Sequence, residues 1–499
     1  MLSRERYNYR PMLHTPFFKA WRARLAPMGA RTPQACQQVR AHTLCQLEAH
    51  FGAWVPEHLF PKAAAKANSR DRDYTRWRTF WCCLWQSLQP AAAGREVVRQ
   101  LQALLALGGG KQISDEDGAY CRARQRLPLS EFPKALAATA QSADGLASAP
   151  PLLRGRCLKA VDGTALTLPD TPKNRQAYPA IQCPEGPAFP MMRLVVIFSF
   201  LSGAIAAMAQ GSLAVSELAL LQELTRQLAK GDILVGDRGF GCYPVLALLQ
   251  QTLGVDFIGR TTRSIDGRRR CKRLGRNDWL VEWKKGPKAS PWMPLAQWTG
   301  LPAQLTLRAV KGSLYTKGFR VRQVTVITTL VDAELYPPQE ILQAYLRRWR
   351  LEMCLDDLKT TLHMDLLRSR SPEMAQKEVY TRLIAHNLVR CTMAQAATQH
   401  AVPLDRMSFK GSLDALRQFS QAMAQARSKK KRQALWAELL QILARDLVPP
   451  RPGRREPRAV KRKKNRYPRL RGPRHQFRDH MKRHERRRIS RARKQGHLM

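Results

Sequence analysis

The sequence predicts an α/β protein, because strand-like and helix-like segments alternate through its middle. Apolar runs typical of buried strands occupy residues 157–161 and 232–236, and residues 194–208 suit two further strands. Apolar residues with helical spacing follow at 217–228 and at 244–253. Strands that alternate with helices in this way favour one sheet covered by helices.

The length of 499 residues predicts several structural units. At roughly 100–200 residues per domain, two to four are expected. Shifts in composition divide the chain into a helical N-terminal domain (1–150), the first part of the α/β core (151–256), a β-rich insertion (257–335), the second part of the core with C-terminal helices (336–450) and a basic arm (451–499).

The N-terminal region is expected to be helical. Helical spacing runs from Arg95 to Leu107, and a second helix is expected from Ser114 to Leu127 with Ser114 as its N-cap. Residues 135–151 are rich in Ala, Ser and Pro, which predicts a linker.

The segment 257–335 differs in composition from the part of the core that precedes it. Short β-prone pieces at 279–284, 305–310 and 319–330 alternate with basic turns. A long helix is expected from about Pro338, with helical texture continuing to about Leu447.

The charge is strongly positive: 85 Lys and Arg face 38 Asp and Glu, a net charge of +47. A folded chain with this excess repels itself unless a polyanion neutralises it. Nucleic acid is favoured as that partner, because each phosphate contact releases counterions. Ribosomal RNA and a membrane surface are the alternatives.

The basic arm, 451–499, carries 21 Lys and Arg and three acids, a net charge of +18. It has little apolar content and is expected to be disordered or conditionally folded. Its one-signed charge favours contact with nucleic acid over a merely solubilising role.

Compartment and membrane signals agree with a cytoplasmic, soluble protein. The eleven cysteines form no C-x-x-C pair, and the odd count suits a reducing compartment. The basic N-terminus lacks the apolar core of a signal peptide. The uncharged stretch Leu194–Gln210 is shorter than the roughly 20 residues of a membrane span, and a buried hairpin turning at Ser202-Gly203 is expected there.

Two acids follow apolar, strand-like runs. Asp162 comes after Val161, and Asp237 comes after Val235-Gly236. An acid at the end of a buried strand is costly unless something pairs with it. Active sites also collect at the carboxyl ends of strands in open α/β sheets.

A third acid lies on the predicted long helix. At 100° per residue, Tyr345, Arg348, Glu352 and Lys359 share a stripe about 60° wide, beside a face of leucines. Asp356 lies 40° from Glu352 on this projection and competes with it as a ligand. Geometry alone leaves open whether the stripe is a site or a solvated charged face.

The spacing Tyr-x2-Arg-x3-Glu-x6-Lys resembles the signature of the DDE transposases of the IS-four family. Further segments resemble the same family, and the resemblance covers most of residues 70–475. These segments are Asp162-Gly163-Thr164, Gly236–Phe240, Asn387–Arg390 and Pro452–Arg458.

The resemblance implies an RNase H-like core with Asp162 on the first strand, Asp237 on a later strand and Glu352 on a helix. The 115 positions from Asp237 to Glu352 leave room for the insertion that the family carries. The three acids would be catalytic and would bind two Mg²⁺ or Mn²⁺ ions, which prefer oxygen ligands.

The resemblance further implies that Tyr345, Arg348 and Lys359 contact DNA phosphates. The expected partner is double-stranded DNA, both the inverted repeats at transposon ends and the target, and the helical N-terminal domain (1–150) is expected to bind DNA. The expected assembly is a homodimer formed on DNA. Its expected location is the bacterial cytoplasm, in association with the nucleoid, and no membrane partner is expected. The alternatives are a transposase-derived endonuclease or sequence-specific DNA-binding protein, and a basic binder without enzymatic activity. The intact triad disfavours the last of these.

One departure concerns a DNA hairpin. In hairpin-forming relatives a Trp lies on the strand before the Glu helix, but Val324–Thr329 has none. Trp298 and Trp349 are the other aromatic candidates, so the resemblance does not extend to a hairpin step.

Overall fold

The structure is a computed structural model in which residues 51–61, 73–90, 92–107, 112–179, 182–183, 186–187, 189–261, 265, 270–314, 322–426 and 428–449 are described, with single positions between 479 and 490. The expectations for the first 50 residues and for the disorder of the basic arm therefore lie outside the described residues.

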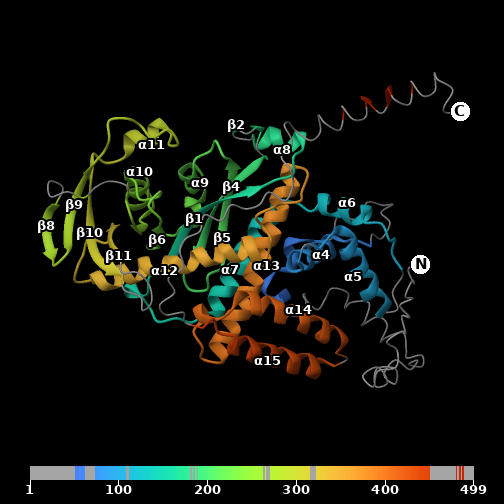
Figure 1. Ribbon diagram of the computed structural model, residues 1–499. Helices are drawn as coiled ribbons and strands as arrows, with labels where there is room; N and C mark the ends of the chain where they lie inside the picture. Colours follow the sequence, from blue (N-terminus) through green and yellow to red (C-terminus); the bar gives the residue numbers. More distant parts are fainter. Residues whose placement is uncertain are drawn as a thin grey trace, which may run out of the picture.

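A large mixed sheet forms the centre of the described chain (Figure 1), which confirms the α/β class. Its nine strands lie in the order β5-β4-β1-β6-β7-β11-β10-β9-β8. β1 is parallel to β6, and β6 to β7, whereas the other neighbours are antiparallel. The bounds are β1 Leu158–Thr167, β4 Met191–Ser199, β5 Ile205–Ser212, β6 Ile233–Gly236, β7 Asp256–Gly259, β8 Arg270–Gly275, β9 Asp278–Lys284, β10 Gln304–Leu314 and β11 Arg322–Thr328. A separate pair, β2 Gln182–Cys183 and β3 Gly186–Pro187, stands apart.

The segment predicted as a β-rich insertion does contain β8 to β11, but these strands extend the central sheet. β11 pairs with β7 through Ile327 and Gly259, and β10, β9 and β8 follow outward. The predicted boundary at residue 257 falls inside β7, which pairs with β6. An unpaired edge on β7 would expose backbone N–H and C=O groups, and β11 satisfies them.

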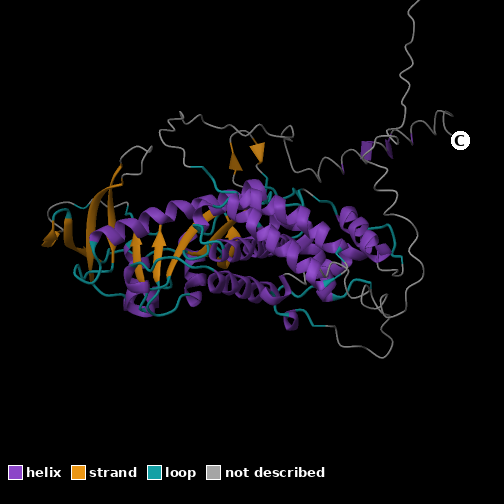
Figure 2. Cartoon of the chain, turned by 90° about the horizontal axis from the view of Figure 1, so that it is seen from below, coloured by secondary structure: helices purple, strands orange, loops and turns teal. Residues whose placement is uncertain are grey.

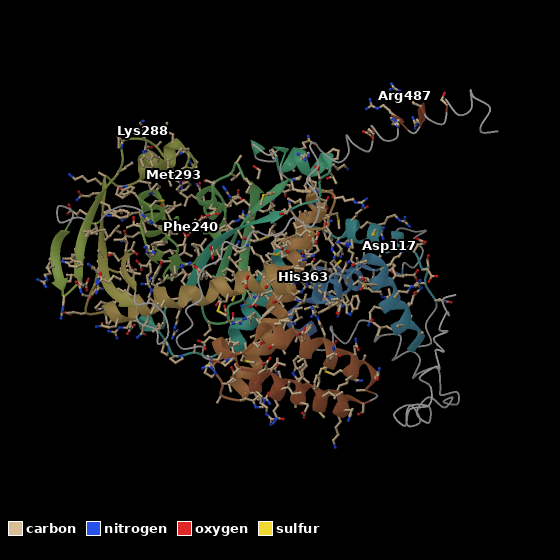
Figure 3. The ribbon with its side chains drawn as sticks, in the orientation of Figure 1. Asp117, Phe240, Lys288, Met293, His363 and Arg487 are labelled. Atoms are coloured by element: carbon tan, nitrogen blue, oxygen red, sulfur yellow. The ribbon has the colours of Figure 1, made fainter. Side chains whose placement is uncertain are left out.

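Helices cover both faces of the sheet, as the view from below shows (Figure 2). One face carries α12 (Pro338–Asp356) and α13 (Pro372–Gln399), and the other carries α9 (Glu217–Leu224), α10 (Tyr243–Ala247) and α11 (Leu295–Gly300). In Figure 3, Met293 and Lys288 lie near α11, far from Asp117 beside α6.

Alternation along the strands separates two cores. Ala160 and Val235 belong to the core shared with α12, whereas Val161 and Leu234 belong to the core of the opposite face. Successive side chains of a strand point to opposite faces, so every second residue joins the same core.

The N-terminal helices are α4 (Arg76–Leu88), α5 (Gly94–Leu107), α6 (Gly118–Arg126) and α7 (Glu131–Leu146). The helix expected to end at Leu107 is confirmed. The expected N-cap Ser114 was wrong, because α6 begins later and Asp117 occupies the cap position.

The linker predicted at 135–151 was also wrong. Most of it lies in α7, which buries Leu136, Ala140 and Ala143 and packs between α13 and β5. Alanine is both a strong helix former and small enough for close helix packing, so the composition that suggested a linker suits a core helix.

The hairpin predicted at Ser202-Gly203 is confirmed by the antiparallel pairing of β4 and β5. Gly203 has φ +72°, and the Arg390 guanidinium lies 2.7 Å from where a Cβ would stand. Arg390 donates to the Ser202 carbonyl at 2.6 Å, so α13 holds this turn.

The C-terminal helices α14 (Phe409–Gln425) and α15 (Lys429–Arg445) pack on α13, and α8 (Pro172–Ala177) follows β1. In the described part of the chain, no helix is long and apolar enough to cross a membrane.

α13 also buries His386, whose ring stacks on Phe409 with centroids 5.0 Å apart. Burial, helped by the Arg390 guanidinium, lowers the pKa of His386 from its ordinary 6.5 to about 3. In the unfolded chain, His386 therefore binds a proton as the pH falls through about 6.5, whereas in the folded chain it stays neutral until the pH approaches 3. The stability contributed by neutral His386 is fully present above pH 6.5 and is lost as pH falls towards 3.

We predict that His386→Phe weakens the decline of stability below pH 6.5. The wild type should lose up to about 1.4 kcal/mol per pH unit more than the variant, the value of one proton. Chemical denaturation of both proteins between pH 5 and pH 8 measures this difference. Parallel pH curves for the two proteins would contradict the prediction.

Candidate active site

Asp162 lies within β1, not at its end as the sequence predicted. The antiparallel ladder with β4 continues past Asp162, which pairs with Val196, as far as Thr167. The ladder to β6 on the other side ends at Ala160. Asp162 therefore stands where β1 no longer pairs with one of its two neighbours, and its Oδ1 accepts the N–H of Gly163 at 2.8 Å.

Asp237 directly follows β6, as predicted. The parallel register pairs Ala160 with Val235, so a continuation by two residues on each strand brings Asp162 level with Asp237. The Asp237 carboxylate accepts the N–H of Gly239 at 2.8 Å, which fixes the turn after the strand.

The alternation of the strands directs both acids to the face covered by α12. Ala160 and Val235 belong to the α12 core; Asp162 lies two residues further along β1, and Asp237 lies two residues after Val235, directly beyond the end of β6. α12 itself contacts β1, β6 and β7 (Figure 1). The two strand acids and the helix acid Glu352 thus meet on one face.

Arg348 links the helix to this group of acids. Its guanidinium donates to Glu352 Oε1 at 2.7 Å and lies 5.6 Å from the Tyr345 ring centre. The Arg348 side chain is 12% exposed and that of Glu352 is 39% exposed. Tyr345 is buried, so its ring packs against the Arg348 guanidinium and does not face solvent.

The electrostatics indicate that the acids influence one another. Burial raises the pKa of Asp162 to about 6, and the carboxylates of Asp237 and Glu352 act in the same direction. The Gly163 N–H and the Arg348 guanidinium lower the pKa. The charges of Asp237, Glu352 and Arg348 therefore all act on the Asp162 carboxyl group.

The helical projection that placed Lys359 on the stripe does not extend to this residue. A π-helical turn, Asp357–Thr361, follows α12, and the 100° projection does not apply within it. Asp356, the competitor of Glu352, is exposed, whereas Glu352 is paired with Arg348 and raises the pKa of Asp162. These observations favour Glu352 as the third acid.

The donor chemistry fits a divalent cation, because three carboxylates supply the oxygen ligands that Mg²⁺ and Mn²⁺ prefer. As the side chains stand, however, no group of three or more His, Cys, Asp or Glu residues in the described ranges is arranged to hold a metal ion. The acids repel one another, and Arg348 binds one oxygen of Glu352. Holding a metal would require these side chains to turn.

Two residues of the site region were not predicted from the sequence. Glu217, at the start of α9, lies against Gly163 from the opposite face, with its carboxylate 2.7 Å from where a Cβ would stand. A Cβ on Gly241 would lie only 1.8 Å from the Arg260 carbonyl oxygen. The Gly239-Phe240-Gly241 run was the one available signal for this close approach.

The aromatic candidates for a hairpin step gain no support. Trp298 is buried in α11 beneath the Lys285 ammonium, 5.2 Å from the ring centre. The Trp349 side chain lies outside the described residues.

Comparison with known proteins shows which proteins this chain is similar to. Residues 153–388 match the family described as a transposase DDE domain. The chain is 27% identical over 355 residues to the transposase InsG for insertion sequence element IS4 of Escherichia coli strain K12, covering 70% of this chain and 77% of that one.

Two further similarities are weaker. The transposase for insertion sequence element IS421 of Escherichia coli is 33% identical over 66 residues, covering 13% of this chain and 18% of that one. A piggyBac transposase, in a synaptic complex with hairpin DNA, has a TM-score of 0.39 and 11% identity, covering 83% of this chain and 86% of that one.

Residues 153–388, which include Asp162, Asp237 and Glu352, match a DDE transposase domain, and DDE transposases are a class of enzyme that generally uses divalent metal ions. Within that class, the similarity to the IS4 transposase supports the IS-four family, as the Tyr-Arg-Glu-Lys spacing indicated.

We predict opposite effects of alanine at two glycines. Gly241→Ala should destabilise the protein by at least about 1–3 kcal/mol, because the methyl group overlaps a backbone oxygen next to the Asp237 turn. Gly145→Ala should stabilise it by about 0.5–1 kcal/mol, because this position in α7 has nothing within 4 Å of an added Cβ. Thermal and urea denaturation measure both. Equal effects at the two sites would contradict the role assigned to Gly241.

Proposed function

We propose that the protein catalyses cut-and-paste DNA transposition through metal-dependent cleavage and joining of phosphodiester bonds by Asp162, Asp237 and Glu352. The observation that carries the proposal is the placement of three acids from β1, the end of β6 and α12 on one face of the sheet. This arrangement is the one expected for an RNase H-like core, with two acids on neighbouring strands and the third on a helix.

Asp162 is the best candidate for a ligand shared by two metal ions, because Asp237 and Glu352 both affect its charge. When bound, two Mg²⁺ or Mn²⁺ ions about 4 Å apart would activate the attacking water or 3′-hydroxyl and stabilise the leaving oxygen. The protein's own part is to hold the three carboxylates on a rigid sheet and helix.

Arg348 is proposed to hold a DNA phosphate beside the acids. A guanidinium can bind a carboxylate and a phosphate at once through its fork of N–H groups, which a lysine cannot reproduce. Its Nε has no hydrogen-bond partner among the described residues, although it is buried. Tyr345 positions Arg348, and Lys359 would reach a neighbouring phosphate from the π-helical turn.

The proposed partner is double-stranded DNA, both the transposon ends and the target. The net charge of +47 opposes association of two free chains and favours a homodimer assembled on DNA, where phosphates supply the counter-charge. A transposase-derived endonuclease without strand transfer is the alternative, since cutting and joining use the same acids.

We predict that Asp162→Asn, Asp237→Asn and Glu352→Gln each lower Mg²⁺-dependent DNA cleavage by at least about 1000-fold while DNA binding persists. Each change keeps the side-chain size but removes an anionic metal ligand. The assay uses the full chain with DNA carrying the element's ends, and gel-shift measurements follow binding.

Asp356→Asn is the matched control for Glu352→Gln, because it removes an exposed acid one turn away. It should cleave at close to the wild-type rate. If Asp356→Asn is inactive and Glu352→Gln is active, the third acid is wrongly assigned. Joined products in a strand-transfer assay distinguish a transposase from an endonuclease.

We predict that deletion of residues 451–499 weakens binding to all DNA sequences alike. Phosphate contacts position a protein on DNA but do not read its sequence. For every phosphate that the shortened chain no longer neutralises, the plot of log affinity against log salt should flatten by about 0.9. Fluorescence anisotropy on end-sequence and random DNA measures both effects. An unchanged salt slope would count against the arm as a DNA-binding segment.

A further inference from the structure

The connection between α12 and α13, residues 363–370, runs along the end of the strand that carries Asp162. Leu366 forms a parallel bridge with Thr167, the last residue of β1. The N–H of Leu367 donates to the Thr167 carbonyl at 2.9 Å, and the N–H of Thr167 donates to the Asp365 carbonyl at 3.1 Å. The chain leaving the catalytic helix is therefore hydrogen-bonded to the catalytic strand.

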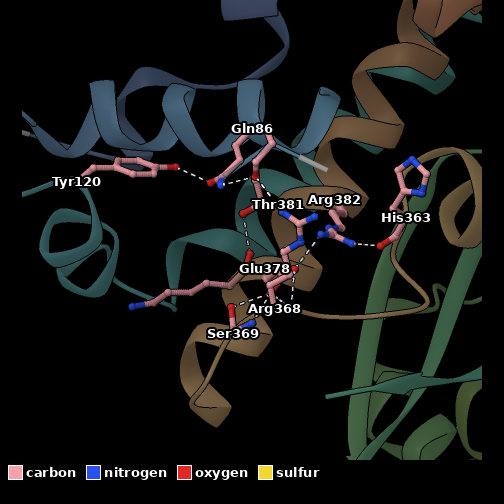
Figure 4. Close-up of polar contacts among 10 residues, drawn as sticks. Gln86, Tyr120, His363, Arg368, Ser369, Glu378, Thr381 and Arg382 are labelled. Atoms are coloured by element: carbon pink, nitrogen blue, oxygen red, sulfur yellow. Dashed lines mark hydrogen bonds and ion pairs between the residues drawn. The ribbon is translucent and has the colours of Figure 1, made fainter. Parts of the chain in front are cut away.

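One buried carboxylate on α13 holds this connection in place (Figure 4). Glu378 accepts the backbone N–H of Arg368 at 3.0 Å and that of Ser369 at 2.9 Å, together with the Ser369 hydroxyl at 2.7 Å. It also accepts from the Arg382 guanidinium at 2.8 Å. Glu378 is only 8% exposed, so its charge is satisfied by these groups and not by water.

The same cluster reaches the end of the catalytic helix. Arg382, which binds Glu378, also donates to the His363 carbonyl, where the chain leaves the π-helical turn. Figure 4 shows this order of contacts from His363 through Arg382 to Glu378. Glu378 thus ties the exit of α12 and the end of β1 to one point on α13.

The cluster continues into the N-terminal helices. The Arg368 guanidinium donates to the Ala92 carbonyl at 3.1 Å, and Gln86 of α4 donates to the same carbonyl at 3.0 Å. The Tyr120 hydroxyl of α6 donates to Gln86 at 2.9 Å. A polar chain therefore connects α4 and α6 with the connection that pairs with β1.

We propose that Glu378 is a positioning residue for catalysis: it fixes the α12–α13 connection and so holds Glu352 of α12 at the right place against Asp162 of β1. This inference rests on the proposed function of the two acids. Because Glu378 is buried on α13, it would act through Ser369, Arg368 and Arg382, and not by contact with the reacting atoms.

The negative charge of Glu378 is essential to this role, because every contact made to it comes from a donor. Glutamine offers one acceptor oxygen and an NH₂ group that would face other N–H donors. Glu378→Gln should therefore loosen the connection without changing the shape of the side chain.

The test compares Glu378→Gln with Glu373→Gln, the same substitution five residues earlier on α13. Glu373 is 62% exposed and pairs with Lys377. Glu378→Gln should lower the rate of DNA cleavage about 10–100-fold and raise the Mg²⁺ concentration needed for half-maximal rate, as removal of a supporting hydrogen bond does. Its DNA affinity should match the wild type. Glu373→Gln should behave like the wild type in all three measurements.

Hydrogen exchange provides a readout that does not depend on activity. The amides of Thr167 and Leu367 should exchange faster in Glu378→Gln than in the wild type or Glu373→Gln. If the wild type cuts no DNA, the proposed function fails, and the exchange rates still decide the coupling. Unchanged exchange, wild-type cleavage by Glu378→Gln or an equal loss in Glu373→Gln would overturn the positioning role.

If Glu378→Gln does not fold, Ser369→Ala replaces it, because it removes a single hydrogen bond to Glu378. Its matched control is Ser130→Ala, whose hydroxyl donates at 3.1 Å to Glu131, a glutamate at the start of α7 whose side chain is 19% exposed. Ser369→Ala should show the same directions of change with a smaller size. Equal behaviour of the two serine variants would overturn the proposal.

Discussion

The repulsion between three carboxylates is the constraint on which this structure depends. Asp162, Asp237 and Glu352 lie on one face, and the first is partly buried, so its ionised form is disfavoured. Such a group persists only when rigid elements hold it and a cation offsets its charge. The sheet supplies rigidity, since β1 and β6 pair in parallel register as far as Ala160 and Val235, two residues before the acids. Arg348 supplies the cation from the same helix as Glu352.

α13 organises the elements around that site. It contacts α4, α7, β5, α14 and α15, and it buries a set of polar groups that each fasten a different part of the chain. Asn387 binds the backbone of Ile205 in β5, and Arg390 holds the turn at Ser202. Glu378 holds the connection that follows the catalytic helix. Because buried polar groups must be satisfied, each of these contacts also specifies one arrangement of its neighbours.

The charge of the chain places a second constraint on function. The net charge of +47 remains after every acid has been counted, so ion pairs within the chain cannot lower it, and a polyanion is the natural counterpart. The acids of the site are the exception to this positive field. An acidic centre in a basic protein can attract divalent cations while the surrounding surface attracts phosphates, which are the two components that phosphodiester chemistry needs.

The sequence by itself determined the elements whose signal is local. The apolar runs of β1 and β6, the helical spacing of α12, and the order of Asp162, Asp237 and Glu352 along the chain all follow from short-range periodicity and motif spacing. Tertiary structure alone decided what depends on distant partners. β4 extends β1 beyond Asp162, β11 joins the insertion to β7, and α13 makes a core helix of the Ala-rich segment taken for a linker. The π-helical turn that contains Lys359 and the buried setting of Glu378 likewise depend on contacts between segments far apart in the chain, which local patterns do not encode.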